Sequence, residues 1–166
     1  MMEGKTMKNF KLALTLAFTI VSTAPAALAK SGQFEEIPAS AMERKETADV
    51  VPVAALAGQD KAKVAAALEK PAKCEKIKYG DKCYYKGGAV EIVFIGGKAD
   101  WFSVSPKDAP LQASSLAQVG LPTDVRPAFQ AKEVLRWKML KDLLEVSMHQ
   151  GAPGKVDFIY VKARTP

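Results

Sequence analysis

Two cysteines, Cys74 and Cys83, are the residues whose types and spacing most directly suggest chemistry in this chain. Eight residues separate them, and the sequence has no third cysteine. In an oxidising compartment an even cysteine count favours a disulfide, which would stabilise the fold by about 2–3 kcal/mol. A redox-catalytic pair would have Cys-x-x-Cys spacing, and a metal site would need more ligands than one distant histidine. We therefore expect a structural disulfide, no metal site and no cofactor.

His149 is the only histidine, so any nucleophile–base catalysis would depend on it. No Gly-x-Ser-x-Gly motif that would present a catalytic serine accompanies it. Two carboxylate pairs recur, Asp100 with Asp157 and Glu91 with Glu145, and paired carboxylates can act in general acid–base catalysis. Equivalent turn and strand-end positions of a repeated structure explain this recurrence better. We predict no catalytic residue and a non-enzymatic protein.

The first 29 residues have the pattern of an export signal. Lys8 and Lys11 precede an apolar run from 12 to 21, and Ala27-Leu28-Ala29 is suited to signal peptidase. The run has about half of the roughly 20 residues that span a bilayer. We expect cleavage after Ala29 and a mature periplasmic protein without a transmembrane segment. Secretion beyond the outer membrane and a start at Met1 or Met7 both stay open.

Residues 30–57 differ in composition from the rest of the chain. They contain three basic and five acidic residues with little apolar periodicity, which predicts a flexible leader with a helical turn near Ala39–Glu46. The remainder has 18 basic and 12 acidic residues, so the positive charge lies on the folded part. We predict a single domain over 58–166.

A locally basic segment with interleaved tyrosines runs from 73 to 86. Its lysines are Lys73, Lys76, Lys78, Lys82 and Lys86. This pattern is typical of nucleic-acid binding, but an exported protein rarely meets nucleic acid, and lysines also guard exposed strands against edge pairing. The segment is either an ordinary solvated face or a weak contact for anionic surfaces. The neighbouring Gly96-Gly97-Lys98 lacks the spacing of a phosphate-binding loop.

One octapeptide occurs twice and indicates how these residues are positioned. The segment 97–104, GKADWFSV, returns at 154–161 as GKVDFIYV. A Gly-Lys turn followed by β-rich residues is typical of the return strand of a hairpin. The recurrence predicts two repeats, about 58–104 and 105–163, although one hairpin signal recurring in a β-rich protein would look similar.

Each predicted repeat has a helix followed by strands. The first begins at Asp60, which can cap a helix with Val64 and Leu68 on one face before Pro71. The second has a short helix over 109–119. The strands fall at 82–86, 90–95 and 99–104, then at 134–139, 142–149 and 156–162. The predicted fold is α+β, a duplicated helix plus three-stranded antiparallel meander that forms one sheet with the helices on one face.

The helix region carries a family resemblance. Leu56-Ala57-Gly58, then Val64, Leu68 and Pro71, resembles the signature of the SmpA/OmlA small lipoproteins of outer-membrane assembly. A tandem of such units is similar to the β-lactamase-inhibitor-protein (BLIP-like) fold. The resemblance implies helices on one face of an antiparallel sheet whose other face is free to bind a protein. The chain lacks the lipidated cysteine of the lipoproteins.

Strand alternation then predicts the binding face. Residues two apart along a strand share one side, so the side opposite the apolar core collects aromatic and polar residues, as protein interfaces do. The predicted partner-binding residues are Trp101, Ser103, Glu145, His149, Phe158 and Tyr160. The other interpretation is that these aromatics merely pack across strands or under the proline-rich loop. The predicted function is a non-enzymatic module that binds an envelope protein. The alternative is an inhibitor of, or protective factor against, a secreted or periplasmic enzyme.

Overall fold

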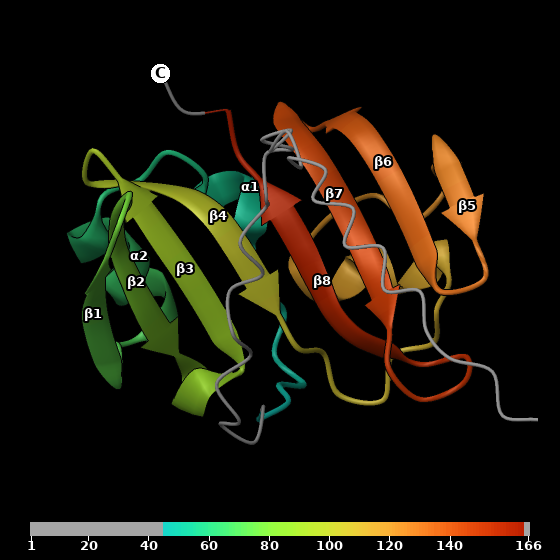
Figure 1. The fold of residues 1–166 in the computed structure, drawn as a ribbon, viewed down its shortest axis with the longest axis horizontal. Coiled ribbons are helices and arrows are strands. Elements are labelled where there is room, and N and C mark those ends of the chain that lie inside the picture. The colour runs from blue at the N-terminus through green and yellow to red at the C-terminus, as the bar shows by residue number, and fades with distance from the viewer. Residues whose placement is uncertain (1–44, 165–166) are drawn as a thin grey trace, which may run out of the picture. The chain divides into compact units, whose positions relative to one another are not determined.

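The computed structural model describes residues 45–164, which form one antiparallel sheet with short helices on one side (Figure 1). The helices are α1 (Val53–Leu56), α2 (Lys61–Leu68) and the 3₁₀ helices η1 (Lys86–Gly88) and η2 (Ala113–Val119). The strands are β1 (Lys73–Ile77), β2 (Gly80–Tyr85), β3 (Val90–Ile95), β4 (Lys98–Val104), β5 (Phe129–Ala131), β6 (Val134–Leu140), β7 (Leu143–Gln150) and β8 (Val156–Lys162). The predicted signal peptide lies outside the described residues.

The strand order is β1-β2-β3-β4-β8-β7-β6-β5. Strands β1–β4 form one antiparallel meander, strands β5–β8 form another, and β4 pairs with β8 where the two meet. This confirms the α+β class with an antiparallel sheet. Each meander has four strands rather than the predicted three. The prediction missed β1, which is charged and largely exposed, and β5, which has only three residues, because neither has an alternating apolar pattern.

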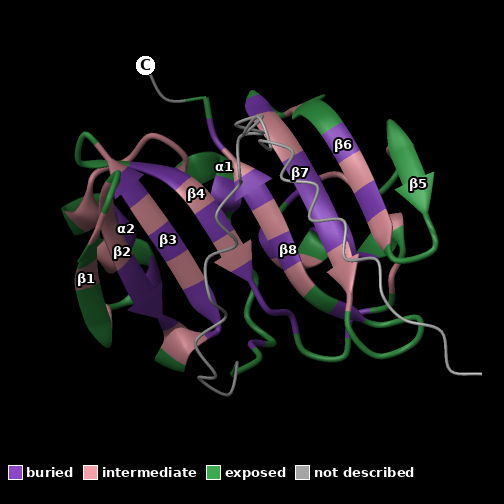
Figure 2. Cartoon of the chain, viewed as in Figure 1, coloured by how far each residue is buried: buried purple, intermediate pink, exposed green. Residues whose placement is uncertain are grey.

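The core lies between the sheet and the helices. Alternate strand residues point to that side, as the banding of buried residues along β3, β4, β7 and β8 shows (Figure 2). The predicted inward set is fully or almost fully buried: Ile92, Phe94, Phe102, Val104, Val146, Met148, Ile159 and Val161. They pack with helix residues Val64, Leu68, Leu116 and Val119 in one cluster. Asp60 caps α2 as predicted, with its carboxylate accepting a hydrogen bond from the Lys63 amide at 2.9 Å.

The domain begins earlier than the sequence predicted. Val51 and Val53 are fully buried in the core, and the Thr47 amide donates to the Ser105 carbonyl at 2.9 Å. Residues 47–57 therefore belong to the folded part and not to a flexible leader. Residues 1–44 lie outside the described residues, and the predicted helical turn near 39–46 falls mostly among them. The lack of apolar periodicity did not reveal that this segment is folded, because isolated residues such as Val51 and Val53 enter the core without forming a periodic pattern.

The two meanders share a local irregularity. The β3–β4 register shifts between Val93 and Phe94, which leaves Asp100 as an extra residue in β4. The β7–β8 register shifts between His149 and Gln150, which leaves Asp157 as the extra residue in β8. Both aspartates follow the Gly-Lys turn at the same spacing, and each is the bulged residue of its strand.

The segment before each helix contacts the same position of the repeat. An isolated antiparallel bridge joins Asp60 to Lys98, and another joins Pro110 to Lys155. Lys98 and Lys155 are the lysines of the two Gly-Lys turns. The second helix is a 3₁₀ helix over 113–119, shorter than the predicted 109–119, because residues 109–111 make this bridge instead.

Candidate functional site: the outer face of the sheet

The face of the sheet opposite the helices, here called the outer face, is defined by two rows of paired residues. One row crosses all eight strands: Lys73, Tyr84, Glu91, Ser103, Tyr160, Ser147, Arg136 and Phe129. The next row is Glu75, Lys82, Val93, Trp101, Lys162, Glu145 and Lys138. Each neighbour in a row is a direct register partner, so these side chains share one side.

All six residues predicted to bind a partner lie on the outer face. Trp101, Ser103, Glu145 and Tyr160 are in the two rows, and His149 pairs with Phe158 farther along β7 and β8. Each of the six is half-buried. The predicted division of the strand residues between the two faces is therefore confirmed. Their role in binding stays a prediction.

Aromatic rings gather around the central strand pair. Trp101 and Tyr160 meet edge to face, with ring centroids 6.1 Å apart and planes at 71°. His149 stacks on Phe158 with centroids 4.5 Å apart and planes at 11°. These contacts cross strands, as the alternative interpretation of the aromatics expected. The result is a preformed aromatic cluster, because each ring is held by its neighbour before any ligand arrives.

Lys162 links this cluster to the β4 bulge. Its ammonium forms an ion pair with the buried Asp100 carboxylate and lies 5.6 Å from the centre of the Trp101 ring. The Trp101 indole N–H has no hydrogen-bond partner among the described residues. Sequence reasoning did not include Lys162, although it lies two residues after Tyr160 and so had to share its face.

Burial sets the ionisation of the two titratable groups at the centre. Burial, with smaller contributions from Glu145 and Asp100, raises the pKa of Tyr160 to about 12. Burial, followed by the positive charge of Arg136, lowers the pKa of His149. Both side chains are therefore neutral at pH 7, and the charge next to the aromatic rings comes from Lys162.

The Ser147 hydroxyl and His149 Nε2 are 3.0 Å apart, which is the distance of a nucleophile–base pair. Both residues lie within a regular strand, whose backbone groups pair with β6 and β8. An acyl-transfer site would also need backbone donors aimed at an oxyanion. The other face of His149 is taken up by Phe158. The contact between Ser147 and His149 therefore fits a packed surface better than a reaction site. The described residues contain no group of three side chains suited to hold a metal ion.

Charged side chains of the outer face lie on both sides of the aromatic cluster, and Lys162 lies beside it on β8. Lys82 pairs with Glu91 at 2.6 Å, and Glu145 pairs with both Arg136 and Lys138. The two rows contain five basic and three acidic side chains. The two rows around the aromatic cluster therefore have a small excess of basic over acidic side chains.

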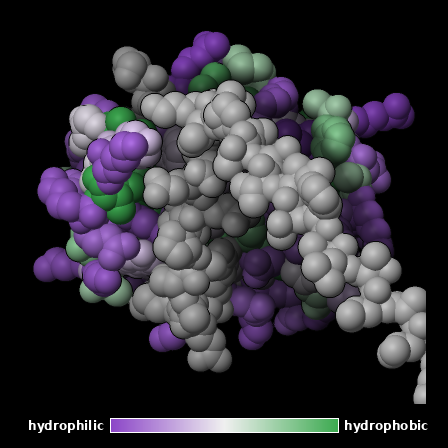
Figure 3. All heavy atoms as spheres, viewed as in Figure 1, coloured by the Kyte–Doolittle hydropathy of each residue, from purple (hydrophilic) through white to green (hydrophobic). Residues whose placement is uncertain are grey.

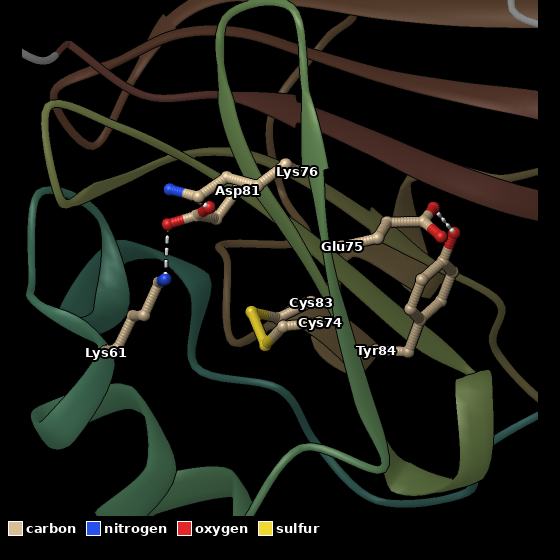
Figure 4. Close-up of a disulfide and its surroundings, with 7 residues drawn as sticks. All are labelled: Lys61, Cys74, Glu75, Lys76, Asp81, Cys83 and Tyr84. Carbon is tan, nitrogen blue, oxygen red and sulfur yellow. Dashed lines mark hydrogen bonds and ion pairs between the residues drawn. A yellow bond between two sulfur atoms is a disulfide. The ribbon is translucent and has the colours of Figure 1, made fainter.

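The predicted disulfide joins β1 to β2. Cys74 and Cys83 are direct register partners with Cα atoms 4.1 Å apart, and Cys83 is fully buried (Figure 4). Asp81 and the disulfide lie toward Lys61 of α2, whereas the Tyr84 hydroxyl donates to Glu75 on the outer face. A disulfide of this kind indicates an exported protein.

The predicted basic segment is largely paired with acids. Lys73, Lys76, Lys82 and Lys86 each form an ion pair with a carboxylate. Lys78 lies 5.3 Å from the ring of Tyr79, which is 63% exposed at the β1–β2 turn. The surface over β1 and β2, at the left of Figure 3, is mainly hydrophilic. Contact with anionic surfaces stays a prediction. Of the five lysines of this segment, Lys78 is the one that these ion pairs do not include.

Comparison with known proteins identifies no family. No family model matches the chain, and no curated protein matches it. The fold is similar to the 1.5 Å crystal structure of an extracellular protein containing a SCP domain from Bacillus anthracis, with a TM-score of 0.48 and 11% identity. The match covers 72% of this chain and 47% of that one, so the chain spans about half the length of that protein. The resemblance to SmpA/OmlA and BLIP-like proteins stays a hypothesis. In residues 45–164 no helix has the length and hydropathy needed to cross a membrane.

Proposed function

We propose that the protein is an exported, non-enzymatic binding module that engages another protein of the cell envelope through the outer face. One observation carries the proposal: the helices pack on one side of the sheet, and the other side presents an aromatic cluster flanked by charge at its centre. Interfaces are enriched in aromatic residues and arginine, and their strongest contacts lie near the centre. Trp101 and Tyr160 occupy that position here.

The same proposal includes duplication as the origin of the sheet. Support comes from two features that a recurring hairpin signal alone does not explain. The bulged aspartates follow the Gly-Lys turns at the same position, and the segments before the helices bridge to the same lysines. Two copies joined at β4 and β8 place both repeated octapeptides at the centre of the outer face. A tandem of this kind is what the resemblance to BLIP-like proteins implies.

The proposed compartment is the periplasm. The export signal and the disulfide support export. The basic side chains of the two rows are all ion-paired, which favours a protein partner over an anionic lipid surface. An envelope protein is the class of partner that a processed, exported module meets.

Capture from envelope extract tests the function. The mature protein should retain a partner, whereas Trp101→Ala and Tyr160→Ala should each weaken binding by about 2 kcal/mol or more, as central interface residues do. Tyr79→Ala is the matched control, because this tyrosine is exposed at the β1–β2 turn and away from the aromatic cluster. Circular dichroism checks that the variants fold. Equal capture by all variants would contradict the proposal, and inhibition of a captured enzyme would identify the inhibitor alternative.

A further inference from the structure

One end of the sheet gathers connections that come from distant parts of the sequence. The strand order places the β1–β2 turn, the β3–β4 turn, the end of β8 and the β6–β7 turn along the same edge, the upper one in Figure 1. The start of α2 joins them, because Asp60 bridges to Lys98 at the start of β4. This edge is here called the turn end, and it consists of residues 60–63, 76–81, 96–98, 139–142 and 163–164.

Charge is distributed unequally between the turn end and the opposite edge of the sheet. The turn end has seven basic and three acidic side chains. The segments at the opposite edge have six of each, in residues 45–49, 69–70, 86–89, 105–109, 132–133 and 151–157. The positive excess of the folded part is therefore concentrated at the turn end.

Most of the basic side chains at the turn end have no carboxylate partner. The exposed ones that form no ion pair with a described residue are Lys63, Lys78, Lys98, Lys141 and Arg164. By contrast, every basic side chain of the two rows on the outer face is ion-paired. The charge that can attract an anionic partner therefore lies at the turn end and not on the outer face.

Two exposed apolar side chains stand at the two outer turns of this edge. Tyr79 in the β1–β2 turn is 63% exposed, and Met139 before the β6–β7 turn is 55% exposed. Met139 has a φ of 53°, in the left-handed region that a methionine rarely adopts. The order of the strands places Lys98 and Arg164 between these two turns. The turn end therefore combines two apolar tips with positive charge between them.

The β1–β2 turn is held in place before any contact is made. Gly80 lies so close to β3 that a Cβ there would be 1.9 Å from a carbonyl oxygen of that strand. Asp81 pairs with Lys61 of α2 at 2.5 Å and with Lys76 of β1 at 2.8 Å, near the disulfide (Figure 4). Because Tyr79 is carried by a fixed turn, contact through it costs little backbone entropy.

We propose that the turn end is a second binding surface, which rests the protein on a bilayer with anionic headgroups. Net positive charge is attracted to such a surface, and apolar side chains at the level of the headgroups add to the attraction. The two apolar tips are about five strand spacings apart, or roughly 24 Å, which suits an extended surface rather than a small anion. The strands then stand on the membrane, and the outer face stays open to the proposed protein partner.

Sedimentation with lipid vesicles tests this surface on the mature chain. At about 150 mM salt the protein should bind vesicles of equal parts phosphatidylglycerol and phosphatidylcholine, and it should not bind phosphatidylcholine alone. Lys78→Glu/Arg164→Glu should weaken binding at least about ten-fold, because basic residues near an anionic surface each contribute. No binding to the anionic vesicles, or equal binding to both kinds, would overturn the inference.

A variant at the opposite edge supplies the matched control. Lys107→Glu/Lys132→Glu changes the net charge of the protein by the same amount, at two exposed lysines outside the turn end. It should keep vesicle binding within about two-fold, because screening limits the effect of charges far from the membrane. Circular dichroism checks that both variants fold. Equal losses in the two variants would overturn the turn end as the contact.

A new tryptophan tests whether the apolar tips enter the bilayer. Tyr79→Trp places it at the turn end, and Phe129→Trp places it on the edge strand β5, where Phe129 is 51% exposed. Relative to the unaltered protein, anionic vesicles with brominated acyl chains should quench the added fluorescence of the first variant and not that of the second. Quenching of Phe129→Trp alone would overturn the inference.

Removal of both apolar tips separates a lipid surface from a general polyanion. Tyr79→Ser/Met139→Ser leaves the charge unchanged and should weaken vesicle binding about ten-fold, because it removes the apolar contribution. Unchanged binding in this variant would reduce the turn end to a general polyanion contact and overturn the assignment to a bilayer.

Trp101→Ala separates this inference from the proposed function. This variant alters the outer face and should bind anionic vesicles as the unaltered protein does. Lys78→Glu/Arg164→Glu should in turn capture the protein partner normally from a detergent-solubilised envelope extract. Vesicle binding that is lost in Trp101→Ala and kept in the turn-end variants would place the membrane contact on the outer face and overturn the inference.

Discussion

The two halves of the sheet have the same strand arrangement but are stabilised differently. The β1–β4 half has a disulfide between its outer strands and an α-helix capped by Asp60. The β5–β8 half has Gln130 and Leu135 at the register positions that correspond to the two cysteines, and its helix is a 3₁₀ helix without a side-chain cap. The same topology therefore tolerates different local solutions, provided that the inward residues stay apolar and the central strands keep their register.

The largest expected effect concerns the disulfide. Replacing Cys74 and Cys83 with alanine should lower the free energy of unfolding by about 2–3 kcal/mol, because the unfolded chain regains the freedom of a closed loop. Urea denaturation measures the change. Amide exchange should increase first in β1 and β2 and leave β6 and β7 protected. Uniform loss of protection across the sheet would contradict the claim that the disulfide stabilises the β1–β4 half in particular.

A disulfide transferred to the other half sharpens the comparison. Gln130 and Leu135 are direct register partners, as Cys74 and Cys83 are, so Gln130→Cys/Leu135→Cys should form a second disulfide under oxidising conditions. Gln130→Cys/Arg136→Cys is the control, because Arg136 faces the opposite side of the sheet from Leu135. Thiol titration of the denatured, unreduced protein should find no free cysteine in the first variant and two in the second. Two free thiols in both would contradict the equivalence of the halves.

A second contrast lies in the buried aromatic residues of β2 and β6, which hold equivalent places in the two halves. Trp137 donates a hydrogen bond to Val125, whereas the buried Tyr85 hydroxyl has no partner among the described residues. Trp137→Phe should cost about 2 kcal/mol through the lost hydrogen bond and a small cavity. Tyr85→Phe should be neutral or slightly stabilising, because it removes an unpaired polar group. Chemical denaturation of the two variants measures both effects, and equal losses would contradict this interpretation.

The bulged aspartates differ as well. Asp100 is fully buried and paired with Lys162, whereas Asp157 is exposed. Asp100→Ala should therefore destabilise the protein by about 1–2 kcal/mol, since it leaves a half-buried ammonium without its carboxylate. Asp157→Ala should change stability by less than about 0.5 kcal/mol. Thermal unfolding of both variants provides the comparison, and a larger loss for Asp157→Ala would reverse it.

The smallest expected effect appears at alkaline pH. The raised pKa of Tyr160 means that the unfolded chain loses this proton first, so stability falls as pH rises from about 10 toward 12. Tyr160→Phe should remove part of that fall. Between pH 8 and pH 11 the melting temperature of this variant should drop by roughly 2–4 °C less than that of the unaltered protein. Burial also raises the pKa of Tyr84 and Tyr85, so a residual fall is expected in the variant. Identical pH profiles would contradict a raised pKa of Tyr160.

Strand alternation was sufficient to predict the division of residues between the two faces, because the side-chain period of a strand is fixed. The Cys74–Cys83 pairing also followed from composition and compartment. Register could not be predicted. The sequence suggested that Glu91 and Glu145 are equivalent, but Glu91 pairs with Ser103 and Ser147 pairs with the corresponding Tyr160, so Ser147 is the counterpart of Glu91. The two bulges fall at the same position of both copies and so do not cause this difference. Nor does any side-chain pattern show in advance where such an extra residue is accommodated.

The edges of the sheet were the other limit. Strand β5 has three exposed residues, and β1 has charged residues on exposed positions, so neither buries enough apolar surface to produce a strand pattern. Their strand geometry comes from pairing with β6 and β2 in the folded sheet. Edge strands of this kind depend on tertiary context more than on their own residues.

A photo-crosslinker at Ser103 tests the central claim most directly, because Ser103 lies between Glu91 and Tyr160 on the outer face. The matched control places the same crosslinker at Lys63, an exposed position of α2 on the opposite side of the sheet. In envelope extract the Ser103 position should form an adduct with a partner protein, and the adduct should disappear in the Tyr160→Ala background. Partner adducts from Lys63 with none from Ser103 would contradict the assignment of the outer face as the binding surface.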